Sequence, residues 1–267
     1  MRKKLLTIVI FSQSWMGAQV AFTSQNTLHL SDNTNKDEKR KFIKAQNGKH
    51  KINLLQEVMK SADLAQVTPG MPGDYLVQST GLKGQSSYKE RYAIIFDKAY
   101  QPVNMNNMVD YPDASNDFSR APSGTMLTVG TSQIWFVDLH AIFGKSIGLR
   151  RAEAGLMATV YNWFAMRSEN GMMTDKIIIA GDWNLPAGDT GFTKLKALST
   201  TMKVLPNVDS SLTKDGNASE AYDHFVWDSA KVSVTETTCD LIDISPKTTQ
   251  WFRKNVSDHR GITCSLP

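Results

Sequence analysis

Polar side chains that can do acid–base or metal chemistry stand beside the apolar runs of this sequence. A buried strand fixes the side chain at its end while the end stays open to a substrate, so such positions are the first candidates for a site. Two of them are histidines, which titrate near neutral pH and can share the roles of base and acid. The candidates are Glu57 after residues 54–55, His140 after 136–139, Asp182 and Asn184 after 177–180, and His259 just before 261–266.

Each of these positions also has an ordinary structural explanation. A glutamate after an apolar strand is usually a solvated loop residue, and a lone histidine is more often structural than catalytic. The Gly-Asp-x-Asn segment at 181–184 can be a simple turn, because Asp and Asn stabilise turns. Their joint occurrence in this order is far less expected by chance, and it indicates one shared site.

The order of these motifs resembles the deoxyribonuclease I branch of the endonuclease/exonuclease/phosphatase superfamily. Gln-Glu, Gly-Asp-x-Asn and Ser-Asp-His are typical of the superfamily at large, whereas Tyr-Lys-Glu-Arg-Tyr and Phe-Ser-Arg point to the nuclease branch. The resemblance extends from Asn26 to the C-terminus. The matching segments are Gln56-Glu57-Val58, Ser87-Tyr88-Lys89-Glu90-Arg91-Tyr92, Phe118-Ser119-Arg120-Ala121-Pro122, Leu139-His140-Ala141, Gly181-Asp182-Trp183-Asn184, Tyr222-Asp223 and Ser257-Asp258-His259.

The resemblance implies an α/β fold, a four-layer α/β/β/α sandwich in which two packed mixed β-sheets are flanked by helices. The sequence itself alternates strand and helix patterns, as a layered α/β domain does. An irregular loop is expected at 102–122 and a turn at 69–73. The expected strands are 21–30, 51–58, 88–96, 125–129, 133–140, 176–180, 222–227, 232–237 and 261–266, and the expected helices are 32–45 and 149–168.

The same resemblance assigns the acid–base groups of a phosphodiester hydrolase. It pairs Glu90 with His140 and Asp223 with His259, and leaves open which histidine is the base. Each carboxylate would fix the tautomer of its imidazole.

The metal and substrate contacts are implied in the same way. A hard divalent cation, Mg²⁺ or Mn²⁺, takes oxygen ligands and would polarise the phosphoryl oxygen. Its expected ligands are Glu57, Asn26 and Asp258. Asp182 and Asn184 would orient the water and the phosphate, Arg120 would contact a substrate phosphate as a bidentate donor and Tyr88 would touch the DNA backbone.

Two departures from the animal enzyme concern its grip on DNA. Animal deoxyribonuclease I carries an arginine shortly after the first-strand asparagine and another just after Gln-Glu-Val. Here these positions read Thr27-Leu28 and Met59-Lys60. Lysine is a point charge without the arginine fork. DNA stays the expected substrate, and these departures leave RNA and single strands open.

Bulk properties and the N-terminus bear on the compartment. The net charge of +4 and the pI of about 8.9 are compatible with a polyanionic substrate and do not demonstrate one. Residues 1–21 have the layout of a signal peptide, with Ala18 or Ala21 just before the cut, so the domain is 22–267 and the protein is secreted or periplasmic. No other run reaches the roughly 20 apolar residues of a membrane helix. We expect a monomer.

The two cysteines, Cys239 and Cys264, are predicted to pair if the chain is exported; the alternative is two reduced, buried thiols. The remaining histidines, His29, His50 and His224, lie outside every motif and are interpreted as surface or structural residues.

Other functions are open on the same scaffold. They are an RNase, a distending-toxin nuclease subunit, a sphingomyelinase, a phosphoinositide phosphatase and a binding protein with a dead site. The binding protein with a dead site is disfavoured because no expected catalytic residue is missing. The loop at 103–116 is mostly polar, which argues against an enzyme that binds lipid.

Overall fold

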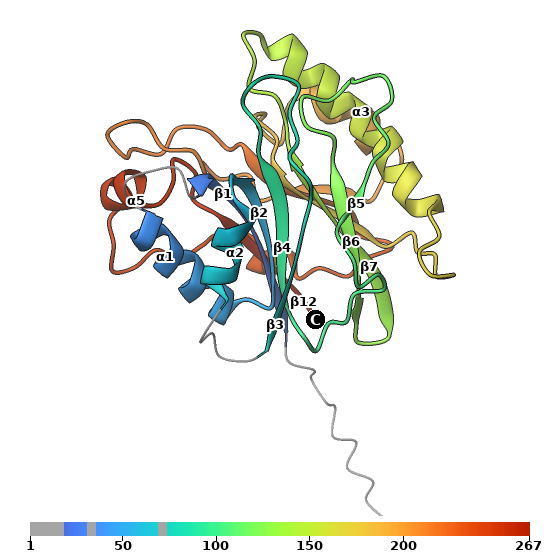
Figure 1. Ribbon diagram of the computed structural model, residues 1–267. Coiled ribbons are helices and arrows are strands. Elements are labelled where there is room, and N and C mark those ends of the chain that lie inside the picture. The colour runs from blue at the N-terminus through green and yellow to red at the C-terminus, as the bar shows by residue number, and fades with distance from the viewer. Residues whose placement is uncertain (1–18, 31–35, 69–73) are drawn as a thin grey trace, which may run out of the picture.

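The computed structural model describes residues 19–30, 36–68 and 74–267. Two six-stranded sheets pack face to face, and helices cover their outer faces (Figure 1). This is the four-layer α/β/β/α sandwich that the sequence predicted. Three predicted features lie outside the described residues: 1–18 of the signal peptide, the start of the first helix at 32–35 and the turn at 69–73.

The first sheet pairs the N-terminal and C-terminal parts of the chain. Its strand order is β11-β12-β1-β2-β4-β3, and β1 runs parallel to β2 with Asn26 opposite Gln56. The strands are β1 (Val20–Leu30), β2 (Ile52–Val58), β3 (Tyr75–Ser79), β4 (Arg91–Asp97), β11 (Asp240–Leu241) and β12 (Ile262–Leu266). The helices on its outer side are α1 (Lys36–Lys49), α2 (Ser61–Val67) and α5 (Thr249–Asn255) (Figure 1).

The second sheet is built from the middle of the chain. Its order is β5-β6-β7-β8-β10-β9, with β7 parallel to β8. The strands are β5 (Val109–Asp110), β6 (Ser123–Val129), β7 (Ser132–His140), β8 (Ile177–Asp182), β9 (Met202–Leu205) and β10 (Asp223–Asp228). The long helix α3 (Ile147–Met166) lies on its outer side, next to η1 (Thr190–Phe192) and α4 (Thr193–Lys196).

Burial on both faces explains the continuous apolar runs of the central strands. Every residue of β2 is buried. Ile52 and Leu54 belong to the core between the sheets, whereas Leu55 and Val58 pack in the cluster that includes Ile43 of α1. A strand with only one covered face would show an alternating pattern, so the apolar runs in the sequence already mark the strands that fix the site.

The prediction of a strand at 232–237 is wrong. Residues 232–235 are irregular, and η2 (Glu236–Thr238) follows them. The alternation of Val232 and Val234 with polar residues has strand periodicity, but both valines pack on the core between the sheets without joining a ladder. Elements that the sequence patterns did not predict are the short ones: α2, β3, β5, η1, α4, β9, η2, β11 and α5.

The disulfide between Cys239 and Cys264 is present, as predicted, and links the segment after η2 to β12. Among the described residues, no helix combines the length and the hydropathy needed to cross a bilayer.

Candidate active site

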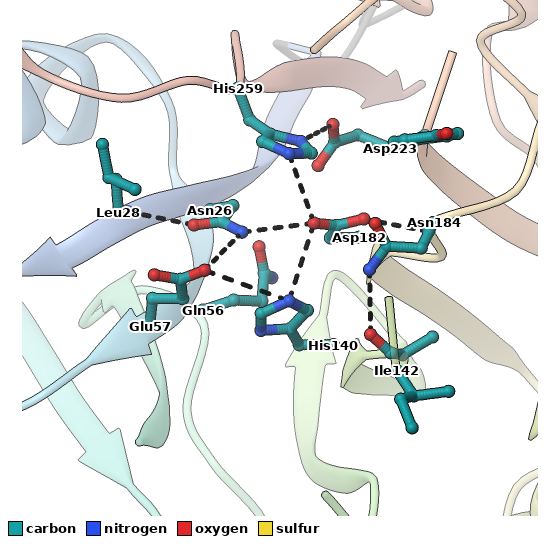
Figure 2. Close-up of polar contacts among 12 residues, drawn as sticks. Asn26, Leu28, Gln56, Glu57, His140, Ile142, Asp182, Asn184, Asp223 and His259 are labelled. Carbon is teal, nitrogen blue, oxygen red and sulfur yellow. Dashed lines mark hydrogen bonds and ion pairs between the residues drawn. The ribbon is translucent and has the colours of Figure 1, made fainter. Parts of the chain in front are cut away.

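An open cleft of about 360 Å³ lies where β1, β2, β7 and β8 end. Parallel neighbours end at the same edge, so β1 and β2 bring their last residues together from one sheet, and β7 and β8 from the other. Figure 2 shows Asp182 between His140 and His259, with Asn26 and Glu57 beside it. The cleft is lined by Asn26, Glu57, His140, Phe143, Asp182, Asn184, Ser211, Leu212, Tyr222, Asp258 and His259.

His140 is the last residue of β7, and its ring is held from behind by Glu90. The ring Nδ1 lies 2.8 Å from Oε1 of Glu90, which is fully buried. The other nitrogen, Nε2, lies 3.7 Å from Oδ2 of Asp182 and 4.0 Å from Oε1 of Glu57. Burial works to lower the pKa of His140, but the Glu90 carboxylate outweighs it and raises the pKa above the ordinary value.

Arg120 lies behind this pair. Its Nε donates to the backbone oxygen of His140 at 3.0 Å, an Nη donates to that of Ala141 at 3.1 Å, and Nε lies 3.7 Å from Oε1 of Glu90. The side chain is only 10% exposed and does not line the cleft. The expected contact with a substrate phosphate therefore finds no support in this geometry. Burial works to raise the pKa of Glu90, but His140 and Arg120 hold it below its ordinary value.

His259 forms the second pair, with Asp223. The ring Nδ1 lies 2.7 Å from Oδ2 of Asp223, and the Ser210 hydroxyl donates to the same oxygen at 2.6 Å. The ring Nε2 lies 3.5 Å from Oδ2 of Asp182. Burial works to lower the pKa of His259, but Asp182 and Asp223 together raise it well above the ordinary value. Both pairings predicted from the sequence are thus present as hydrogen bonds.

Asp182 is placed by an unusually close approach of β8 to β7. It sits opposite His140 in the ladder, one residue after Gly181. Gly181 has a φ of +146°, and a Cβ there would lie 1.8 Å from the backbone oxygen of Leu139. Only glycine fits such a position. The glycine of the Gly-Asp-x-Asn motif therefore lets the carboxylate reach both imidazoles.

Asn184 closes the same turn. Its φ of +52° is in the left-handed region, which asparagine tolerates better than most residues. Its backbone N–H donates to Oδ1 of Asp182 at 2.9 Å, and its side-chain amide donates to the backbone oxygen of Ala141 at 2.9 Å. The residue therefore fixes the carboxylate of Asp182 while it lines the cleft.

Glu57 is held in a strained conformation beside β1. Its φ is +58°, which is rare for a residue with a long side chain and is often found at functional sites. The Asn26 amide donates to Oε1 of Glu57 at 3.1 Å and to Oδ2 of Asp182 at 3.2 Å. The Asn26 oxygen accepts from the N–H of Leu28. Asn26 therefore links the two carboxylates as a donor instead of turning its oxygen toward a metal.

The donor set fits a hard divalent cation. Within the described residues, ligand atoms gather in two groups within 4.8 Å: Glu57 with Glu90 and His140, and Asp182 with Asp223 and His259. In each group one carboxylate lies behind an imidazole, so the carboxylates that line the cleft are those of Glu57, Asp182 and Asp258. Asp258 is 30% exposed, and Arg253 lies 3.8 Å from it. Several carboxylates facing one cleft favour a cation among them.

His29 and Tyr88 lie beside Glu57. His29 donates its backbone N–H to Oε2 of Glu57 at 3.0 Å, and its ring Nε2 lies 3.2 Å from the same oxygen. The Tyr88 ring packs against the His29 ring at a tilt of 43°, with a centroid distance of 5.2 Å. Burial raises the pKa of Tyr88. Sequence reasoning set His29 aside because it belongs to no motif. The only signal was its place on the same strand as Asn26.

Two serines hold the loop of His259 in place. The Ser257 hydroxyl donates to the backbone oxygen of Asn26 at 2.7 Å and accepts from the N–H of His259 at 3.1 Å. Ser257 belongs to the Ser-Asp-His motif, whereas Ser210 has no sequence signal. His224 is fully buried, with its ring nitrogens at backbone oxygens of Pro206 and Leu185, as expected of a structural histidine.

Comparisons with known proteins identify the fold. No family model and no curated protein matches the chain. D. rerio TDP2 with a single-strand DNA product is similar at a TM-score of 0.63 and 15% identity, with 94% of this chain and 100% of that chain covered. An endonuclease/exonuclease/phosphatase from Bacteroides vulgatus has a TM-score of 0.63 and 17% identity, with 94% and 99% of the two chains covered. The human Nocturnin catalytic domain with bound sulfate has a TM-score of 0.61 and 15% identity, with 93% and 94% covered. The chain therefore has the endonuclease/exonuclease/phosphatase fold that its motifs implied.

Proposed function

We propose that this protein is a metal-dependent endonuclease that hydrolyses phosphodiester bonds in DNA. The observation that carries the proposal is the position of Asp182. Its Oδ2 lies 3.7 Å from Nε2 of His140 and 3.5 Å from Nε2 of His259, at the wall of an open cleft. Each imidazole is backed by a buried carboxylate, so both are oriented for proton transfer in the same small volume.

Hydrolysis needs a group that takes a proton from water and one that gives a proton to the leaving oxygen. His140 and His259 are the two groups that can do so, because each presents Nε2 to the cleft while Nδ1 is held by Glu90 or Asp223. Asp182 lies between them and orients both rings and the attacking water.

Glu57 and Asp258 would hold Mg²⁺ or Mn²⁺, with Asp182 next to them. When bound, such a cation neutralises and polarises a phosphoryl oxygen. Asn26 keeps Glu57 and Asp182 at a fixed separation by donating to both.

The proposal of DNA as the substrate is supported by the fold and by the charge. D. rerio TDP2, which has the same fold, was solved with a single-strand DNA product, and human Nocturnin with a sulfate anion. The net charge of +4 is compatible with a polyanion. RNA is the second candidate.

We also propose that the protein is exported and acts as a monomer. The disulfide between Cys239 and Cys264 is favoured by an oxidising compartment. Strand β1 begins at Val20, and its first two residues pair with Leu266 and Ser265. A cut after Ala18 would leave this strand whole, whereas a cut after Ala21 would remove two paired residues. The mass of the secreted protein tests the cut.

The direct test compares substrates in parallel. Purified protein with Mg²⁺ is incubated with duplex DNA, single-stranded DNA, RNA and sphingomyelin, with and without excess EDTA. We expect DNA cleavage that EDTA and H259A abolish. H50A is the matched control, because His50 lies at the end of α1 with Nδ1 2.9 Å from the backbone oxygen of Gln46, remote from the cleft in the fold. No cleavage of any substrate by the wild type contradicts the proposal.

A further inference from the structure

One exposed aromatic ring lines the candidate active site. Phe143 is 57% exposed, although a phenylalanine of a soluble protein is usually buried. It lies three residues after His140, in the loop between β7 and α3, and lines the same cleft as His140, Asn184 and His259. The mechanism proposed above gives this ring no role.

The ring is held in place by Arg150 of α3. The guanidinium carbon lies 3.9 Å from the centroid of the Phe143 ring, and Nε donates to the backbone oxygen of Phe143. An Nη donates to the Tyr222 hydroxyl at 3.2 Å and to the backbone oxygen of Asn184 at 3.3 Å. A guanidinium anchored at three points covers the ring on one side, so the ring is fixed before any ligand arrives.

The surroundings of the ring favour an anion-bearing ligand. Arg150 contacts the ring, Lys145 follows Phe143 by two residues, and the sequence from 141 to 152 contains no acidic residue. Lys145 is exposed and Arg150 is partly exposed. An aromatic platform next to basic side chains is the combination that binds single-stranded nucleic acid, because every base has a π-face and every linkage a negative charge.

We propose that Phe143, clamped by Arg150, is a stacking platform for one unpaired nucleobase next to the bond that is cut. This inference rests on the proposed function and names the form of substrate for that site. The base faces of a duplex are already stacked on one another, so a platform of this kind selects single-stranded or frayed nucleic acid.

A lipid surface is the competing ligand for an exposed apolar loop. Ile147 and Leu149, on the same segment, are 47% and 50% exposed. The geometry favours a base over a lipid, because Phe143 lines the cleft while Ile147 and Leu149 do not. A ring pinned by a cation is also less free to project into a bilayer.

The experiment separates the base from the backbone of the ligand. A fluorescein-labelled single-stranded hexanucleotide and its fully abasic counterpart, with the same phosphates, are titrated with the H259A protein in Mg²⁺, and anisotropy gives the Kd. The H259A background slows cleavage of the probe during the titration. We expect the H259A/F143A protein to bind the base-containing probe about tenfold or more weakly, because stacking contributes this much per base. Its affinity for the abasic probe should change little.

Two further variants keep the test specific. H259A/F143W should restore binding of the base-containing probe, and H259A/L149A, which changes an exposed apolar residue outside the cleft, should bind like H259A. Equal loss on both probes, or no loss on either, overturns the platform. Co-sedimentation of the wild type with sphingomyelin–phosphatidylcholine vesicles that F143A and L149A both abolish overturns it in favour of a lipid.

Failure of the proposed function gives a different pattern. Wild-type protein is assayed separately on bis(p-nitrophenyl) phosphate, which has no base to stack. Hydrolysis that H259A abolishes supports the phosphodiesterase site whatever the binding of the hexanucleotide shows. Absence of hydrolysis there and on DNA contradicts the proposed function, while the binding comparison still decides whether Phe143 stacks on a base.

Discussion

The two histidine pairs of the cleft present the same chemistry from different supports. His140 ends β7, a strand with hydrogen-bonded neighbours on both sides, and lies opposite Asp182 in the ladder. His259 lies in the segment before β12, where Ser257 and Gln25 hold its backbone by side-chain hydrogen bonds. The same segment pairs with Ser211 in an isolated antiparallel bridge. One ring is therefore positioned by a continuous ladder, and the other by a single bridge, two side-chain hydrogen bonds and the strand that follows it.

The two pairs also differ in what backs the carboxylate. Glu90 has the guanidinium of Arg120 beside it, which weakens the effect of Glu90 on the pKa of His140. Asp223 receives a hydrogen bond from the neutral Ser210 hydroxyl instead. Asp182 and Asp223 raise the pKa of His259 well above its ordinary value, whereas Glu90 raises the pKa of His140 with Arg120 opposing. Two pairs with the same geometry thus differ in the charges around them.

The largest effect is expected from removing either imidazole. H140A and H259A should each lower kcat/KM on DNA by about 10²- to 10⁴-fold, the usual contribution of a general acid or base. If the pairs act as one unit, the double variant loses little more than either single variant. Steady-state kinetics of the three proteins measure this. Multiplicative losses would show that the two histidines act independently.

The second-largest effect is expected from removing the disulfide that anchors β12, the strand after His259. C239S removes the disulfide to β12, which closes a loop with a sequence separation of 25. A loop of this length should contribute about 3 kcal/mol to the free energy of unfolding. Urea unfolding of the wild type and C239S measures the loss, and C264S should match C239S. An unchanged unfolding midpoint would contradict this prediction.

The third effect sharpens the electrostatic difference. Arg120 lowers the pKa of His140, so R120M should raise that pKa and move the limb of the pH–rate profile that belongs to His140 to higher pH. Loss of two hydrogen bonds to backbone oxygens should also lower kcat/KM by about tenfold. S210A, on the other pair, should leave that limb in place. A shift of the limb to lower pH sinks the assignment.

The smallest effect is expected on the free energy of unfolding and concerns Lys39 of α1, which contacts β1. Lys39 is fully buried, donates to the backbone oxygen of Leu28 and has a pKa lowered to about 8 by burial. Because the unfolded chain holds this proton up to a higher pH, folding becomes more favourable as pH rises above 8. In EDTA, the wild type should gain about 1 kcal/mol of stability between pH 7.5 and pH 9.

K39M should lose this gain, because no group is left to titrate at that position. Urea unfolding at the two pH values compares the proteins. Equal pH dependence in wild type and K39M means that other groups carry it.

The sequence alone determined which candidate residues lie at the ends of the strands that meet at the cleft. The Gly-Asp-x-Asn and Ser-Asp-His motifs stand next to apolar runs, and these runs are strands because both faces of the sheets are covered. Gly181 is needed where β8 approaches β7, and a local motif records that need. Residue type and period are local properties, which a sequence displays directly.

Tertiary structure decided which way side chains turn and which short segments become regular. Arg120 faces backbone oxygens instead of the cleft, His29 lies against Glu57, and Phe143 is held by Arg150. The valines at 232–234 have strand periodicity but pack without a ladder. Each outcome depends on contacts that form only when the segments pack together, and its stability comes from that packing and burial. No local pattern contains that information, so only the folded chain fixes it.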